Sequence, residues 1–252
     1  MIEREVSDKV VVLRMVHGKA NALDSEFCRT LIDTLDALQK DDARAVVLTG
    51  SGKIFSAGVD LFRVVDGGSD YLEEFLPLLL EAFAKLFAFP RPLVAAVNGH
   101  AIAGGCVVAC ACDYRLMAKG GGRIGVPELL VGVPLPTVAL EILRFAVGNA
   151  HLQSAIYSGD TFAPDEAVDL GFVDELCDED ELSGLASNRA AHFASILAPS
   201  YALAKRQLHQ PVQARIQERG PEDDESVRAI WMDPKTLDNM RDYLQRTLGK
   251  KG

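Results

Sequence analysis

Two glycine-containing segments have the composition of loops whose backbone amides could bind a ligand. Residues 55–61 (FSAGVDL) and 98–106 (NGHAIAGGC) each follow a short apolar run. In the second segment the glycines stand at the expected start of a helix, where free N–H groups point outward and carry partial positive charge. Two such amides directed at one oxygen would form an oxyanion hole, suited to a thioester carbonyl that becomes an enolate. The alternative is that the glycines only permit tight turns and close packing.

The apolar runs before these segments are the strands that must position them. Residues 45–49 (AVVLT) and 93–97 (LVAAV) are continuous apolar runs, typical of strands buried on both faces. Asp24 can cap a helix with apolar residues at helical spacing, and residues 71–89 form an apolar helix ended by prolines. Because strands alternate with helices up to about residue 175, the predicted fold class is α/β.

The last part of the sequence has a different pattern, helical and charged. Beyond about residue 180 the strand signals stop, and we expect breaks at Pro199, Pro211 and Gly220-Pro221. Residues 218–225 (ERGPEDDE) are expected to be an exposed connector. We therefore predict a core of residues 1–195 and a C-terminal helical region of residues 196–252.

The composition is that of a globular protein and argues against several classes. The 252 residues are 48% hydrophobic and carry a formal net charge of −10, which argues against a general nucleic-acid or anionic-membrane binder. The longest apolar stretch, residues 93–112, is interrupted by Asn98, Gly99 and His100, so we expect buried core rather than a membrane span. The N-terminal sequence lacks the pattern of a signal peptide. Five cysteines without such a signal indicate reduced thiols, and the expected location is the cytoplasm.

Five segments, taken in order, resemble the crotonase, or enoyl-CoA hydratase/isomerase, superfamily. They are residues 19–23 (KANAL), 48–61 (LTGSGKIFSAGVDL), 96–106 (AVNGHAIAGGC), 112–115 (CDYR) and 162–174 (FAPDEAVDLGFVD). Their order and spacing make the resemblance specific, and the resemblance extends over most of the chain. The resemblance implies a spiral of β-β-α units with a C-terminal helical trimerisation region, and hence a homotrimer or a dimer of trimers. Members of the family bind acyl-CoA thioesters and stabilise an enolate formed from them.

The resemblance also implies site residues, position by position. The oxyanion hole would consist of the N–H groups of Val59 and Gly104. The residues implied to contact coenzyme A are Lys19, Ala20, Ala22, Ala57, Asp60 and Leu61. Those implied to line the acyl pocket are Val107, Pro127 and Pro136. No metal and no redox cofactor are expected, because coenzyme A arrives as part of the substrate.

Glu128 is the acid/base group that the resemblance implies, although a glutamate here also fits a surface position at a helix N-terminus. Hydratases of the family hold a water between two glutamates. The first of these positions is Val107 here, and the second is Glu128. A single carboxylate suits 1,3-proton transfer better than hydration, and the local pattern is similar to the Δ3,Δ2-enoyl-CoA isomerases, so we expect an isomerase. An apolar pocket would raise the pKa of Glu128 toward the working pH.

Two departures from the family pattern affect the expected site. Residues 133–137 (VPLPT) replace a glycine-rich segment, and this wall of the acyl pocket must differ because proline fixes φ and removes an N–H donor. The lysine that usually follows the first loop is absent, and Arg63 is its candidate substitute. A second carboxylate could come from Glu81 or Glu141, although each is expected to be structural or exposed.

Other functions remain open on the sequence alone. Hydration, thioester hydrolysis and decarboxylation are alternatives on the same scaffold, and a product assay separates them. A non-catalytic acyl-CoA binding protein is a rival from another class, since Val107 has removed one acid/base group. RNA binding occurs within the superfamily, but the acidic charge and the lack of a basic run argue against it. We expect an acyl-CoA substrate, with no nucleic-acid and no membrane partner.

Overall fold

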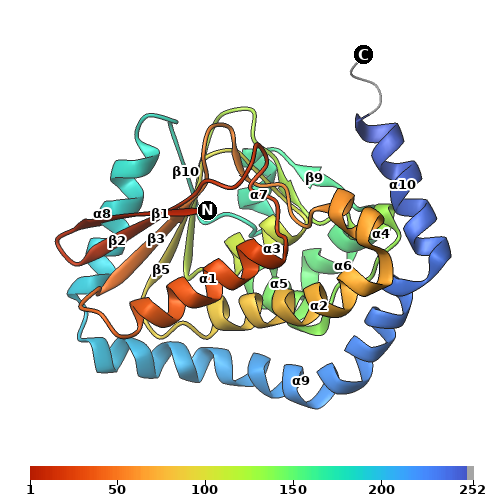
Figure 1. Ribbon diagram of the computed structural model, residues 1–252. Helices are drawn as coiled ribbons and strands as arrows, with labels where there is room; N and C mark the ends of the chain where they lie inside the picture. The colour runs from red at the N-terminus through yellow and green to blue at the C-terminus, as the bar shows by residue number, and fades with distance from the viewer. Residues whose placement is uncertain (249–252) are drawn as a thin grey trace.

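The larger sheet of the protein holds the two predicted strands at its centre (Figure 1). The computed structural model describes residues 1–248. In order across the sheet, the strands are β1 (Ile2–Ser7), β2 (Val10–Met15), β3 (Ala45–Thr49), β5 (Leu93–Val97), β7 (Tyr114–Ala118) and β10 (Glu175–Cys177). β1 is antiparallel to β2, and the remaining pairs are parallel.

Helices cover both faces of this sheet, which explains the continuous apolar runs in its central strands. Val46 and Leu48 of β3 pack on one face with residues of helices α1 (Ser25–Leu38) and α2 (Leu61–Phe87). Ala45 and Val47 pack on the other face, against α8 (Leu182–Ser195). Every residue of β3 and β5 is therefore buried, as the sequence predicts.

The smaller sheet repeats the path of the larger one. Its strands, in order, are β4 (Ile54–Ser56), β6 (His100–Ile102), β8 (Ile124–Gly125) and β9 (Thr161–Phe162). The chain passes from the larger sheet to the smaller sheet and then into a helix as β3-β4-α2, then as β5-β6-α3, and then as β7-β8-α4. The short helices are α3 (Gly104–Cys110) and α4 (Glu128–Val131). The predicted spiral of β-β-α units is confirmed.

The first two helices begin at capping aspartates. The Asp24 carboxylate accepts a hydrogen bond from the Phe27 N–H, which confirms the predicted cap of α1. α2 begins at Leu61, well before the predicted residue 71, because Asp60 caps it and Gly68, with φ of 58°, joins two helical segments across a kink. The start that the sequence predicted for this helix is therefore wrong.

The C-terminal half is mostly helical. Besides α8 and the short strands β9 and β10, it contains α5 (Thr137–Val147), α6 (Asn149–Ser158), α7 (Pro164–Asp169), α9 (Ala198–Met232) and α10 (Pro234–Leu248). α9 runs as one long helix beneath the core, and α10 turns up beside α4 (Figure 1). Pro211 and Pro221 lie inside α9, so the breaks expected there are wrong. Each proline removes one N–H donor, but the buried side chains of Val212 and Trp231 join the main core and keep the helix in place. Within residues 1–248, no helix combines the length and the apolar composition that crossing a bilayer requires.

Residues 218–225, expected to be an exposed connector, belong to α9 and carry a tertiary contact. The Thr137 N–H, at the first position of α5, donates to the Asp224 carboxylate at 2.8 Å. Pro136, which precedes α5, provides no side-chain cap. A side chain from α9 therefore caps α5, and this contact depends on the fold rather than on the local sequence.

Replacing Asp224 by alanine should destabilise the protein by about 1 kcal/mol, the usual cost of losing an N-cap oxygen. Asp223→Ala is the matched control, since Asp223 is exposed and adjacent. Urea unfolding followed by circular dichroism measures both changes. Equal stability of the two variants would show that the Asp224 contact does not stabilise α5.

Candidate active site

Two turns that follow neighbouring strands of the smaller sheet lie against each other. β4 and β6 pair in parallel, so residues 57–60 and 103–104 follow the carboxyl ends of neighbouring strands and emerge on the same side of the sheet. Gly58 has φ of 82°, and a Cβ built there would lie 2.7 Å from Ala103 Cβ and 2.9 Å from Gly104 N. A real side chain does not fit at those distances, so glycine at position 58 is what permits the two turns to touch.

Val59 and Gly104 carry one backbone amide from each of these two turns. Gly104 is the first residue of α3, where an N–H has no acceptor inside the helix. Ala103, just before it, has φ of 54°, a conformation rare for residues other than glycine. In residues 1–248 neither amide donates a hydrogen bond to a protein acceptor, and both residues line one pocket. Two free donors beside one pocket are suited to a developing oxyanion.

Residues 20–23 run beside the first of these turns and support it. The Ala57 N–H donates to the Ala20 carbonyl at 3.0 Å, and the Leu23 N–H donates to the Gly58 carbonyl at 2.8 Å. The Asp60 N–H in turn donates to the Leu23 carbonyl at 3.0 Å. The segment that the family resemblance assigns to coenzyme A is therefore part of the wall that holds the first turn.

Asn21, which sequence reasoning did not single out, anchors that wall. Its buried side-chain amide donates to the carbonyls of Ile54 and Phe55, each at 3.2 Å, and its own backbone carbonyl accepts from Ser56 Oγ at 2.7 Å. Its φ is 45°, a left-handed conformation in which asparagine is enriched. An asparagine between two alanines was the available signal for such a turn.

Of the residues predicted to contact coenzyme A, two line the pocket and the others lie outside its lining. Ala57 and Leu61 line the pocket described below. Lys19 is exposed, Ala20 and Ala22 are half-buried, and Asp60 caps α2 through the Phe62 and Arg63 N–H groups. Their contacts with coenzyme A remain predictions.

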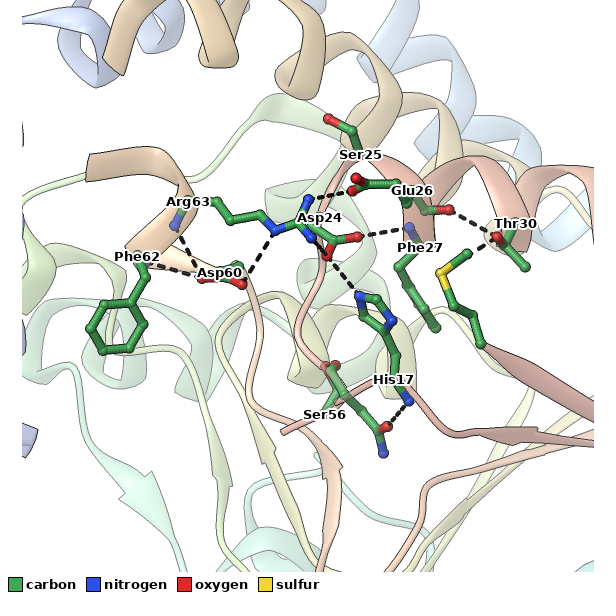
Figure 2. Close-up of polar contacts among 12 residues, drawn as sticks. His17, Asp24, Ser25, Glu26, Phe27, Thr30, Ser56, Asp60, Phe62 and Arg63 are labelled. Carbon is green, nitrogen blue, oxygen red and sulfur yellow. Dashed lines mark hydrogen bonds and ion pairs between the residues drawn. The ribbon is translucent and has the colours of Figure 1, made fainter. Parts of the chain in front are cut away.

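Arg63, the candidate substitute for the missing lysine, is surrounded by carboxylates (Figure 2). It lies 2.5 Å from Glu26, 3.5 Å from Asp24 and 3.9 Å from Asp60. Its hydrogen bond to Glu26 lowers the pKa of that carboxyl and raises the pKa of the guanidinium. Asp24 also accepts from His17 at 2.7 Å. The charge of Arg63 is therefore already matched by the protein, which does not favour a role in binding a phosphate.

One apolar pocket of about 100 Å³ brings the other predicted site residues together. Those in its lining are Ala57, Val59, Leu61, Gly104, Val107, Pro127, Glu128 and Pro136. Val133 and Leu135 of the proline-containing segment also line it, so this segment does form a wall of the pocket. Besides one carboxylate, the described lining is almost entirely apolar or aromatic.

Glu128 is the carboxylate in this pocket and is the first residue of α4. Its side chain is buried, and Oε2 has no hydrogen-bond partner among the described residues. Burial raises its pKa from the ordinary value of 4.5 to about 8, because removal from water disfavours the charged form. The structure therefore shows that the surroundings of Glu128 are apolar, which is the condition for a raised pKa that the sequence alone does not reveal.

No second carboxylate accompanies Glu128 in the lining formed by residues 1–248. Val107 is fully buried in the same pocket, at the position to which the family resemblance assigns the first glutamate of hydratases. Glu141 is buried elsewhere and pairs with Arg215 at 2.6 Å and Arg144 at 3.1 Å. Glu81 is exposed, 3.9 Å from Lys85. Both alternatives are thus structural or exposed, as the sequence analysis expected.

The C-terminal helices of the same chain close the pocket, through residues that the sequence analysis missed. Trp231 at the end of α9 and Tyr243 on α10 are part of the lining. The Trp231 indole N–H donates to the Pro134 carbonyl at 3.1 Å, and Asn239 Nδ2 donates to the Val131 carbonyl at 2.6 Å. These contacts join positions about a hundred residues apart, so no local sequence pattern predicts them.

The cysteines and other ligand-type side chains form no metal site in the described part of the chain. All five cysteines are buried and unpaired. No group of three or more His, Cys, Asp or Glu side chains within residues 1–248 has the geometry to hold a metal ion.

The spiral fold and this pocket define a protein of the crotonase class. The profile of the family described as "Enoyl-CoA hydratase/isomerase" matches residues 5–235. The chain therefore belongs to the enoyl-CoA hydratase/isomerase family, and the resemblance noted in the sequence is confirmed.

Similar proteins include both isomerases and hydratases. The chain is 28% identical to mitochondrial enoyl-CoA delta isomerase 1 of Rattus norvegicus over 255 aligned residues, covering 100% of this chain and 88% of that protein. It is 36% identical to a putative enoyl-CoA hydratase of Thermus thermophilus over 180 residues, covering 70% of each. The structure of human mitochondrial Δ3-Δ2-enoyl-CoA isomerase superposes with a TM-score of 0.94 at 26% identity, covering 100% of this chain and 99% of that one.

The raised pKa of Glu128 predicts that the free energy of unfolding of the wild type falls as the pH rises, and that Glu128→Gln abolishes this fall. The folded protein retains this proton to about pH 8, whereas the unfolded chain releases it near pH 4.5, so rising pH between these values favours the unfolded state. The stability of the glutamine variant relative to wild type should therefore grow across this window, by up to about 1.4 kcal/mol per pH unit, and level off above it.

Urea unfolding between pH 5 and pH 9 measures this difference, and Glu81→Gln is the exposed control, expected to show no such trend. A stability difference for Glu128→Gln that does not change with pH would contradict the raised pKa.

Proposed function

We propose that the protein is a Δ3,Δ2-enoyl-CoA isomerase in which Glu128 carries the proton. The observation that supports this most strongly is the buried Glu128 carboxylate beside Val107, with no second carboxylate in the described lining. Hydration normally needs another group to orient the water. The relatives named as isomerases favour the same reaction, while those named as hydratases make hydration the second candidate.

The proposed reaction moves one proton between two carbons of the substrate. Glu128 removes a proton from C2 of a 3-enoyl thioester and becomes neutral, while the electron pair shifts toward the carbonyl oxygen. The N–H groups of Val59 and Gly104 stabilise the resulting dienolate. Glu128 then returns the proton to C4, and the double bond lies between C2 and C3. A pKa near 8 suits a group that must both accept and donate the proton.

We propose that coenzyme A enters only as part of the substrate and that no other cofactor takes part. Every step above is a proton transfer, with no change in oxidation state of the thioester. The residues proposed to contact coenzyme A are Lys19, Ala20, Ala22, Ala57, Asp60 and Leu61. Lys19 is exposed beside the oxyanion turn, and Arg63 is already paired with carboxylates.

The proposed location is the cytoplasm. Five buried, unpaired cysteines fit a reducing compartment. Several relatives are named as mitochondrial proteins, so this location is inferred from the chain's own residues and not from theirs.

Incubating the protein with a 3-enoyl-CoA should give the 2-enoyl-CoA, and Glu128→Gln should lower kcat by about 10²–10⁴-fold, since glutamine cannot accept a proton. Glu81→Gln, an exposed glutamate on α2, is the matched control and should retain full activity. The product is identified by chromatography and by the absorbance of the conjugated thioester.

Two other results would replace this proposal. Uptake of water by a 2-enoyl-CoA at a rate above isomerisation would make the protein a hydratase. Binding of acyl-CoA without turnover of either substrate, unchanged in Glu128→Gln, would make it a binding protein.

We also propose that the chain forms a homotrimer or a dimer of trimers. Leu203, Leu208 and Phe145 are large apolar side chains left exposed on and beside α9, and burial against a sister subunit would remove them from water. Multi-angle light scattering should give three or six times the chain mass of 27.2 kDa. A monomer across micromolar concentrations would contradict this proposal.

A further inference from the structure

Helices α9 and α10 of the same chain contribute Trp231 and Tyr243 to the wall of the pocket that holds Glu128. Val59 and Gly104 of the two turns line this pocket, and Leu135 and Ala139 are among its other walls. Resting on the function proposed above, we propose that Trp231 sets an upper limit on acyl length, and that the substrates are short-chain 3-enoyl thioesters of about six carbons or fewer.

The size of the pocket supports this limit. An apolar cavity of about 150 Å³ holds one benzene molecule, which has six carbons. The pocket here measures about 100 Å³, so the part of an acyl chain that it encloses is limited to about the size of benzene. An acyl group of four to six carbons matches that space, whereas ten carbons would require its walls to move.

The wall formed by Trp231 is held in place by several contacts. Trp231 is only 3% exposed, and its indole N–H is bonded to Pro134, whose φ is restricted by its ring. On either side, Asp224 bonds the first turn of α5, and Asn239 bonds the Val131 carbonyl at the end of α4. These contacts hold the indole in its position, so a longer chain would have to break them to displace it.

The facing walls leave little room for another path. Phe83 and Leu79 of α2 are each 2% exposed and lie in the same lining. Tyr243 is the one aromatic lining residue in the described chain that is partly exposed, so it is the alternative candidate for the residue that limits the chain length.

The experiment is a chain-length series measured in the wild type and in Trp231→Leu. We expect kcat/KM for 3-enoyl-CoA substrates to fall at least 10-fold from six to ten carbons in the wild type. In Trp231→Leu, the ten-carbon substrate should recover at least 10-fold relative to the six-carbon one, mainly through KM. Ile230→Ala, an exposed neighbour on α9, is the control and should keep the wild-type preference.

Calorimetric binding of hexanoyl-CoA and decanoyl-CoA tests the limit without any reaction. Both ligands carry the same coenzyme A, so their ratio of Kd values reports only on the acyl group. The wild type should bind hexanoyl-CoA at least 10-fold more tightly. If this ratio holds while no isomerase activity is found, the proposed reaction fails and the length limit stands.

Three results would overturn the inference. They are equal or tighter binding of decanoyl-CoA by the wild type, no binding of either ligand, and a chain-length preference that Tyr243→Ala relaxes but Trp231→Leu does not. If Trp231→Leu fails to fold, Leu135→Ala enlarges the same space from the facing loop and is expected to give the same shift in preference.

Discussion

The contact between the turns at Gly58 and Gly104 is the constraint on which the rest of the site depends. Two backbone amides can act on one oxygen only if the chain segments that carry them approach to van der Waals distance. The parallel pairing of β4 and β6 places both turns at one edge, and the absent side chain of Gly58 removes the remaining obstacle. Asn21 and residues 20–23 then hold the first turn from behind. Backbone donors fixed in this way need no reorganisation when charge develops.

The buried carboxylate of Glu128 is the second feature on which the proposed site depends, and its burial lowers the stability of the fold. Glu128 lies among apolar side chains with one oxygen unpartnered, so its charged form is disfavoured at neutral pH. The same apolar surroundings bring its pKa close to the pH at which it would work as a base and then as an acid. Glu128 Oε2 has no partner among the described residues to offset its burial. Glu141 is also buried, but two arginines compensate its charge.

The C-terminal helices complete the pocket from a distance in sequence. α9 caps α5 through Asp224 and contributes Trp231, and α10 packs on α4 and contributes Tyr243. The C-terminal part of the lining therefore comes from the same chain as Glu128. This arrangement gives the helical tail a direct part in shaping the site, in addition to the oligomer contacts that we propose for it.

The sequence by itself determined the strands at 45–49 and 93–97, the cap at Asp24, the family, and several residues that line the pocket with Glu128. These follow from local chemistry, because burial on both faces, helix capping and glycine turns each leave a pattern within a few residues. The start of α2, the continuity of α9 through Pro211 and Pro221, and the role of Trp231 were decided only by the tertiary structure. The prolines are tolerated inside α9, and Trp231 reaches the Pro134 carbonyl, because segments far apart in the chain pack against each other. The local sequence around these residues does not indicate such packing.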